Sequence, residues 1–198
     1  MKLSELCSVQ SGLTLRNGLG PPTVSGMLVV QPSDITDEGE LAIGRSSRMA
    51  NTDIRAHHLI QPGDVLFKSR GAHNSAWSSG EGIDEPAVAL MPLFVLRPTS
   101  SALDANYLAW FINQLPAQQQ LAQGATGTTV RTINKPVLMD LEVKLPPLRV
   151  QRKIAELAAL DRIERNLVDR LANLRHQVIS LRLNELSQNC SNELSRQA

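Results

Sequence analysis

The residues PPLRVQRKIAELAALDRIERNLVDRLANLRHQVISLRLNELS, from Pro146 to Ser187, decide how the rest of the chain is interpreted, because no Gly or Pro follows Pro147 in this stretch. Leucines recur there every seven residues, and further apolar residues precede three of them by three positions. Together they form what we call the seam: Leu157, Leu160, Leu167, Leu171, Leu174, Val178 and Leu181. Apolar residues alternating at spacings of three and four lie along one side of a helix.

Such a helix is about 60 Å long at 1.5 Å per residue, which is too long for the core of a small domain. The seam therefore needs a partner. We expect a compact head, residues 1–146, followed by a protruding coiled-coil helix, residues 147–187, and a frayed polar tail, residues 188–198.

Composition sets further bounds. The chain has 198 residues, enough for one domain with a sizeable core plus an appendage. The N-terminus lacks the apolar run of a signal peptide, and no segment is apolar enough to span a membrane. The two cysteines, Cys7 and Cys190, are expected to be reduced cytosolic thiols. Residues 1–146 carry 11 Lys/Arg and 13 Asp/Glu, a net charge of −2, whereas residues 147–198 carry 9 and 6, a net charge of +3. If the head binds nucleic acid, it must use a local basic surface.

Periodicity and turn signals predict a head of mixed type. Asp104 is a plausible N-cap for the helix that follows it, and Lys68–Glu85 is expected to be an exposed loop around Trp77. The predicted helices are Lys2–Gln10, Ala105–Leu115 and Ala117–Ala122, and the predicted strands are Met27–Gln31, Leu41–Gly44, Val65–Phe67, a pair within Ala87–Leu96, and Val137–Leu145. Short irregular strands with one mid-chain and one long terminal helix favour the α+β class, a mixed α/β head with a long C-terminal helix.

Motifs of common enzyme classes are missing from the sequence. There is no dinucleotide-binding fingerprint and no nucleophile elbow, and Gly124–Thr129 is not followed by the Lys-Ser/Thr pair of a phosphate-binding loop. The Asn/Asp-Pro-Pro-aromatic tetrapeptide of amino-methyltransferases is also missing, so base methylation would require another chain. We therefore expect neither a catalytic residue nor a cofactor in this chain.

Two weaker patterns have a plain structural explanation. His57 and His58 are neighbours that would point to opposite faces of a strand, with other histidines remote, so surface histidines explain them better than a metal site. Asp140, Glu142 and Lys144 have a spacing used by nucleases, but they alternate on a predicted strand, where one solvated face explains them better.

Three groups of basic and polar residues remain as candidates for contacting DNA. Arginine and lysine pair with guanine edges and phosphates, asparagine pairs with adenine, and hydroxyl groups suit phosphate contacts. The groups are Lys68, Ser69, Arg70 and Asn74; Thr128, Thr129, Arg131 and Lys135; and, more weakly, Arg45, Arg48 and Arg55. The alternative is that these are ordinary solvated or packing charges. For Trp77, core or rim packing is favoured over stacking on a base.

Three stretches resemble the specificity subunits of type I restriction-modification systems. Gly63–Gly71, GDVLFKSRG, is similar to a signature of their recognition domains. Tyr107–Ile112 is similar to their mid-domain helix, and Leu145–Ile154, LPPLRVQRKI, to the start of their spacer helix. Order and spacing also fit over nearly the whole chain. Val150 stands where that family usually has Glu. This departure affects the start of the expected helix but does not remove the helix.

Members of that family usually carry two target-recognition domains and two spacer helices, whereas this chain has one of each and thus resembles a half-subunit. The resemblance implies that residues 1–146 are a target-recognition domain that reads half of a bipartite site in double-stranded DNA. It also implies antiparallel pairing of spacer helices, docking of methyltransferase subunits that supply catalysis, and a restriction subunit as a further partner. Two copies related by a twofold axis would form a homodimer through their seams and recognise a symmetric, interrupted sequence.

Two other functions stay open at this point. A coiled-coil interaction scaffold without DNA binding fits the acidic balance of residues 1–146, and salt-dependent binding to duplex DNA would separate the two hypotheses. An enzyme that uses Asp140, Glu142 and Lys144 ranks last, and it would require metal-dependent cleavage by the isolated chain.

Overall fold

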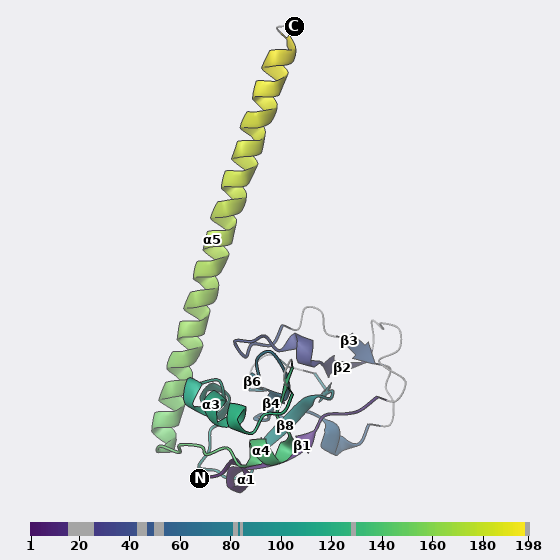
Figure 1. The fold of residues 1–198 in the computed structure, drawn as a ribbon, viewed down its shortest axis with the longest axis vertical. Coiled ribbons are helices and arrows are strands. Elements are labelled where there is room, and N and C mark those ends of the chain that lie inside the picture. Colours follow the sequence, from purple (N-terminus) through teal and green to yellow (C-terminus); the bar gives the residue numbers. More distant parts are fainter. Residues whose placement is uncertain are drawn as a thin grey trace. The chain divides into compact units, whose positions relative to one another are not determined.

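The computed structural model describes residues 1–15, 26–42, 47–49, 54–80, 83, 85–127 and 130–196, with side chains on the C-terminal helix described as far as Glu185. The chain divides into a first unit, Met1–Ala155, and a second unit, Glu156–Ala198. Short strands and helices make up the first unit, and helix α5 (Leu148–Arg196) begins there and continues through the second (Figure 1). The mixed class with a long C-terminal helix is therefore as predicted from the sequence.

Strands of the first unit form three sheets among the described residues. The four-stranded sheet is antiparallel, in the order β1 (Cys7–Ser11), β8 (Leu93–Pro98), β4 (Val65–Lys68) and β6 (Ala76–Ser78), and Figure 1 shows the strands side by side in this order. The second sheet has the order β3 (Ser47–Met49), β2 (Met27–Val30) and β7 (Ala87–Ala89), with β2 and β7 parallel. The third pairs β5 (Arg70–Gly71) with β9 (Arg131–Thr132).

The four-stranded sheet is covered on both faces. Val65 and Phe67 of β4 pack with α1 (Leu3–Leu6), α2 (Ala105–Ile112), α3 (Leu115–Gln123) and α4 (Lys135–Met139) on one side. Leu66 packs on the other side with Val30 of β2 and Ala89 of β7. A strand buried on both faces shows a continuous apolar run rather than alternation, which is the pattern Val65–Phe67 has in the sequence. Burying one such side chain contributes about 1.5–3 kcal/mol.

Helix boundaries follow from local capping. Asp104 is the N-cap of α2 as predicted, with its carboxylate accepting a hydrogen bond from the Tyr107 amide at 3.0 Å. The prediction of one helix as far as Leu115 is wrong at its C-terminal end, because α2 ends at Ile112 and α3 begins at Leu115. Pro116 fits the first turn of α3, where its missing amide hydrogen costs nothing.

Two predicted elements are wrong in type. Only Leu3–Leu6 of the predicted helix Lys2–Gln10 is helical, and β1 follows because Cys7 and Val9 are buried while Ser8 is exposed, a period of two. The predicted strand Val137–Leu145 instead begins inside α4. The Asn134 side chain caps that helix by accepting a hydrogen bond from the Val137 amide at 3.1 Å. After α4, Glu142 makes an isolated bridge with Lys2, and Leu141 and Val143 on either side of it are buried.

Other boundaries differ by smaller amounts. The predicted loop Lys68–Glu85 contains β5 and β6, and its residues from 74 to 79 are buried rather than exposed. Leu41 makes an isolated bridge with Ile35 where a strand was predicted, and Ile43 and Gly44 lie outside the described residues. Helix α5 continues to Arg196 through most of the predicted frayed tail, whose last two residues also lie outside the described part.

Candidate nucleic-acid interface

The short sheet of β5 and β9, which we call the ribbon, joins the first two groups of candidate residues. Arg70 pairs in register with Thr132, and Gly71 pairs with Arg131. The Ile133 amide donates a hydrogen bond to the Ser69 carbonyl at 2.8 Å. Thr132 of β9 also makes an isolated bridge with Thr126, which lies outside the ribbon. Residues that lie 61 positions apart in sequence (70 and 131) thus become neighbours in space.

The two arginines of the ribbon are exposed and lie on opposite faces of it. Directly paired residues of two strands share a face, so Arg70 shares one face with Thr132 while Arg131 lies on the other face, opposite Gly71. Within the described part of the chain, neither guanidinium has an ion-pair or hydrogen-bond partner. Lys135, the exposed first residue of α4, is likewise without one among those residues.

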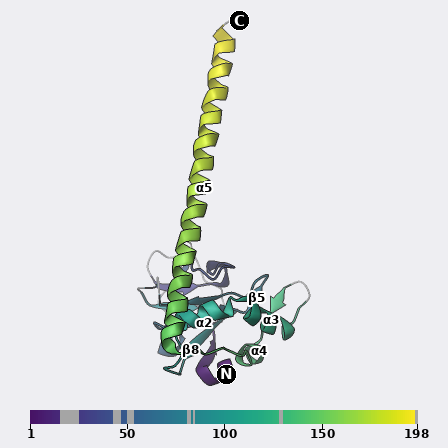
Figure 2. The same ribbon diagram turned by 90° about the vertical axis from the view of Figure 1, so that its left-hand side faces the viewer.

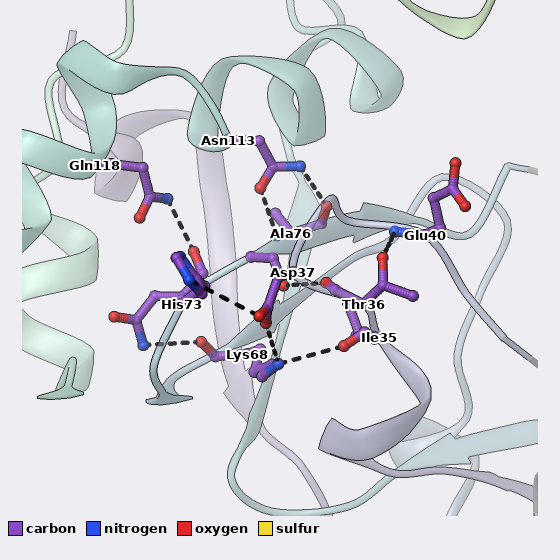
Figure 3. A network of polar contacts seen from close by, with 11 residues as sticks. Ile35, Thr36, Asp37, Glu40, Lys68, His73, Ala76, Asn113 and Gln118 are labelled. Carbon is purple, nitrogen blue, oxygen red and sulfur yellow. Dashed lines mark hydrogen bonds and ion pairs between the residues drawn. The ribbon is translucent and has the colours of Figure 1, made fainter. Parts of the chain in front are cut away.

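The other residues of the first group hold the base of the ribbon in place. Lys68 donates from its Nζ to Asp37 Oδ1 at 3.0 Å and to the Ile35 carbonyl at 3.4 Å (Figure 3). Ser69 is buried, and its hydroxyl donates to the Pro92 carbonyl at 2.6 Å. Lys68 and Ser69 are both candidate DNA contacts from the sequence, and both make hydrogen bonds within the fold.

The turn after β5 is fastened to α3 and to the segment around residue 36. Asn74 is buried, and its Nδ2 donates to the Lys68 carbonyl at 3.1 Å. Gln118 of α3 donates to the Asn74 carbonyl at 2.9 Å, and Ser75 donates from its hydroxyl to the Thr36 carbonyl at 2.7 Å. Figure 2 shows α3 close to β5, as this hydrogen bond requires.

Strand β6 is fixed by a side-chain clamp that was not recognised in the sequence. Asn113, the residue after α2, accepts a hydrogen bond from the Ala76 amide and donates to the Ala76 carbonyl, both at 2.8 Å (Figure 3). Next along the strand, Trp77 is buried in the core, which confirms core packing over exposure for base stacking. Asn113 lies inside the helix predicted over Ala105–Leu115, so nothing local in the sequence indicated its contact with a residue 37 positions away.

The Gly-Asp pair of the Gly63–Gly71 stretch has a structural role. Asp64 is 1% exposed and receives two hydrogen bonds from Arg97 of β8, one from Nε at 2.8 Å and one from Nη2 at 2.7 Å. These bonds raise the pKa of Arg97. Gly63 has a φ of +87°, a conformation that favours glycine. Arg97 was missed in the sequence because nothing local links it to a residue 33 positions away.

The other two stretches of the resemblance meet at the start of α5. Gln151 has a fully buried side chain that donates to the Ala102 and Pro146 carbonyls at 2.8 and 2.7 Å and accepts from the Asp104 amide at 2.9 Å. Tyr107 of α2 donates from its hydroxyl to the Lys144 carbonyl at 2.8 Å, and burial raises the pKa of this phenol. Both side chains thus fix the chain around the first turn of α5.

The third group of candidates contributes little to an open basic surface. Arg48 makes two hydrogen bonds to Glu85, at 2.7 and 2.6 Å, and one to the Gly26 carbonyl at 3.0 Å. Hydrogen bonding to Glu85 raises the pKa of Arg48, and hydrogen bonding to Arg48 lowers the pKa of Glu85. Arg45, Thr128 and Thr129 lie outside the described residues.

Two findings concern the histidines and carboxylates singled out in the sequence. No group of three His, Cys, Asp or Glu side chains in the described part of the chain could hold a metal ion. Asp140 pairs with Lys2 at 2.8 Å, and neither Asp140 nor Lys144 lies on a strand. Among the described helices, none is long and apolar enough to cross a membrane.

The seam of α5 is exposed throughout. Its seven members are between 48 and 66% exposed. Along the same helix, a shallow apolar groove is lined by Leu160, Ile163, Glu164, Leu167, Val168 and Leu171. Exposed apolar side chains in such a row are typical of a surface that pairs with another helix.

Comparison with known proteins gives a likeness of fold. No family model matches the sequence, and no curated protein matches it. A chain from a structural study of complex assembly and conformational transition in a type I restriction-modification system aligns with a TM-score of 0.58 and 23% identity, over 84% of this chain and 38% of that one. The HsdS subunit from Thermoanaerobacter tengcongensis aligns with a TM-score of 0.55 and 22% identity, over 84% and 37%.

A third solved structure, the type I restriction-modification S subunit from M. genitalium, aligns with a TM-score of 0.55 and 16% identity, over 85% of this chain and 40% of that one. The chain therefore spans less than half the length of the proteins it matches. The resemblance predicted from three short stretches is confirmed at the level of fold, and this chain has the fold of one part of the type I specificity subunits.

Proposed function

We propose that this chain is a non-catalytic DNA-recognition subunit of a type I restriction-modification system. In this role it reads one half of a bipartite site in double-stranded DNA and positions a methyltransferase subunit, and in a complete system a restriction subunit, that supply the chemistry. The fold likeness supports the class of protein, and the ribbon supports the mode of recognition.

The observation that carries the proposal is the pair of exposed arginines on opposite faces of a two-stranded ribbon. The major groove of B-form DNA admits a two-stranded ribbon. With such a ribbon in the groove, Arg70 and Thr132 face the base edges, where arginine pairs with guanine O6 and N7 and threonine contacts either base. Arg131, on the opposite face, then contacts a phosphate.

The framework below the ribbon supports this reading of the site. Ser69, Asn74 and Lys68 each make hydrogen bonds within the fold, so the backbone of β5 is held before DNA arrives. A pre-organised loop loses less conformational entropy on binding. We therefore assign these three residues, which the sequence suggested as DNA contacts, to positioning the ribbon instead.

Duplex binding over a range of salt concentrations tests the proposal. Arg70→Ala should weaken binding to the cognate site by about 1–3 kcal/mol, and Arg131→Ala should lower the salt slope by about one. Lys144→Ala removes one exposed positive charge outside the ribbon and is the matched control. Unchanged affinity of the Arg70→Ala, Arg131→Ala double variant would contradict this mode of binding. Binding that is weak and insensitive to salt for every variant would favour the coiled-coil scaffold, which the acidic balance of residues 1–146 suggests.

A symmetric pair of chains completes the proposed subunit. The described residues hold one recognition unit and an exposed seam, and a homodimer through α5 would supply two recognition units to one DNA site. Light scattering at micromolar concentration should then give twice the chain mass of 21.6 kDa.

A further inference from the structure

The charges beside the seam are arranged so that they constrain how a second helix can lie on it. Heptad positions place the seam residues and Glu164 at the centre of the contact, with Asp161, Val168 and Arg175 along one flank. Ile163 and Arg170 lie along the other flank. Glu164, Arg170 and Arg175 are exposed and have no ion-pair partner among the described residues, whereas Asp161 pairs with Arg165 of the same helix at 2.7 Å.

We propose that α5 of a second copy covers the seam in antiparallel orientation and in one register, with the twofold axis crossing each helix at the height of Asp169. This inference rests on the proposed homodimer and specifies its contact. Opposed residues in this register are Leu157 with the partner's Leu181, Leu160 with the partner's Val178, Leu167 with the partner's Leu171, and Glu164 with the partner's Leu174. Three of these four layers, each present twice, contain apolar residues alone.

The register gives Glu164 a basic neighbour. In antiparallel pairs, residues of the same flank meet across the contact. Glu164 borders the flank of Asp161 and Arg175, and it lies about 1.5 Å along the axis from the partner's Arg175. On the other flank the two Arg170 side chains approach each other near the twofold axis, where their length keeps the charged groups in water. A glutamate at a seam position would otherwise be costly to bury.

Asp161, on the same flank, meets the same arginine. It lies about 3 Å along the axis from the partner's Arg175, and the two Val168 side chains meet at the twofold axis. Each of these contacts occurs twice by symmetry. Thus the register that opposes the leucines also places both acidic side chains, Asp161 and Glu164, beside the partner's Arg175.

Registers shifted by one heptad combine these contacts less well. With the axis between Ala172 and Asn173, Asp161 and Glu164 would meet the partner's Arg182, but Leu160 would oppose the partner's Glu185 and Val168 would meet the partner's Arg175. With the axis between Arg165 and Asn166, both acidic side chains would lose their arginine, because Asp161 would meet the partner's Val168 and Arg175 would face the partner's Ile154. The proposed register also opposes Glu164 to the partner's Leu174 and Arg182 to the partner's Ile154, but it alone gives both acidic side chains an arginine and keeps three apolar layers.

Disulfide cross-linking distinguishes the registers, because a disulfide needs Cα atoms within about 7 Å. In a Cys190→Ser background that keeps the buried Cys7, a mixture of Leu167→Cys and Leu171→Cys chains should give a cross-linked dimer on mild oxidation. Mixtures of Leu171→Cys with Leu174→Cys, or of Leu160→Cys with Leu171→Cys, should not, since these residues are about 10 Å apart along the axis. Leu167→Cys alone cross-links only if the helices are parallel.

Charge reversal supplies a second readout that is independent of cysteine chemistry. Asp161→Arg should raise the dimer dissociation constant about tenfold, since it breaks two symmetric pairs and adds like charges, and adding Arg175→Asp should restore it. Asp169→Arg, on the outer face of the helix at the same height as the axis, is the matched control and should have little effect. Preferential cross-linking of a shifted pair, or failure of the double swap to rescue, would overturn the register.

Both readouts are made without DNA, so failure of the register leaves the DNA-binding test of the proposed function standing. A chain that stays monomeric at all concentrations would overturn the homodimer and the register together. If the register holds, the two Leu148 residues lie about 60 Å apart along the helix axis.

Discussion

Gln151 offers a direct test of what fixes the first turn of α5. The side chain is fully buried and makes three hydrogen bonds, to the Ala102 and Pro146 carbonyls and from the Asp104 amide. Gln151→Met keeps the length and helix propensity of the residue but removes all three bonds. At about 1 kcal/mol of net stability per hydrogen bond, the variant should lose about 3 kcal/mol of unfolding free energy.

Urea unfolding followed by circular dichroism measures this loss, at one fixed protein concentration because association also stabilises the fold. The loss corresponds to a fall of about 6–12 °C in Tm for a domain of this size. Lys153→Met is the matched control, because it introduces methionine two residues later, at an exposed position of the same helix. It should change the free energy of unfolding by no more than about 0.5 kcal/mol. If Gln151→Met were as stable as this control, the three hydrogen bonds would not hold the helix start.

Two further predictions concern the first unit. Gly39 has a φ of +79°, and a Cβ there would meet the Asn113 side chain and the Ala76 carbonyl, so Gly39→Ala should cost about 3 kcal/mol in urea unfolding. Gly63→Ala is its control, because Gly63 has a φ of +87° but open space around it and should lose only about 1 kcal/mol; equal losses would contradict the clamp argument. Burial raises the pKa of Cys7 to about 12, so the folded state retains a proton that the unfolded state loses near pH 9. The contribution of the Cys7 thiol to the free energy of unfolding is therefore complete below about pH 9 and declines as the pH rises toward 12. Parallel plots of unfolding free energy against pH for the wild type and Cys7→Ala would contradict this prediction.

The sequence was informative wherever one local signal determined the structure. The heptad leucines predicted α5 because periodicity over many residues is a strong signal of a helix. Asp104 predicted the start of α2 because an N-cap acts within one turn. The apolar run Val65–Phe67 predicted β4, which has its core neighbours on both faces.

Predictions failed where distant residues decide the outcome. Cys7–Ser11 forms a strand because β8, far along the chain, supplies its hydrogen-bond partners. Lys68 was named as a candidate DNA contact from its neighbours in the sequence, which do not indicate its pairing with Asp37 of a separate turn. The ribbon itself could not be predicted, because nothing near Arg70 in the sequence indicates pairing with Thr132. Local patterns therefore named both arginines of the ribbon but not their arrangement.

Selection of binding sites from random duplexes, with the purified chain and its methyltransferase subunit, tests the central claim most directly. Two identical recognition units related by a twofold axis should enrich a symmetric sequence made of two half-sites with a fixed gap between them. Arg70→Ala should relax the preference at one position in each half-site, as expected for an arginine that contacts a base. Enrichment of a continuous asymmetric sequence, or no enrichment at any salt concentration, would contradict the claim.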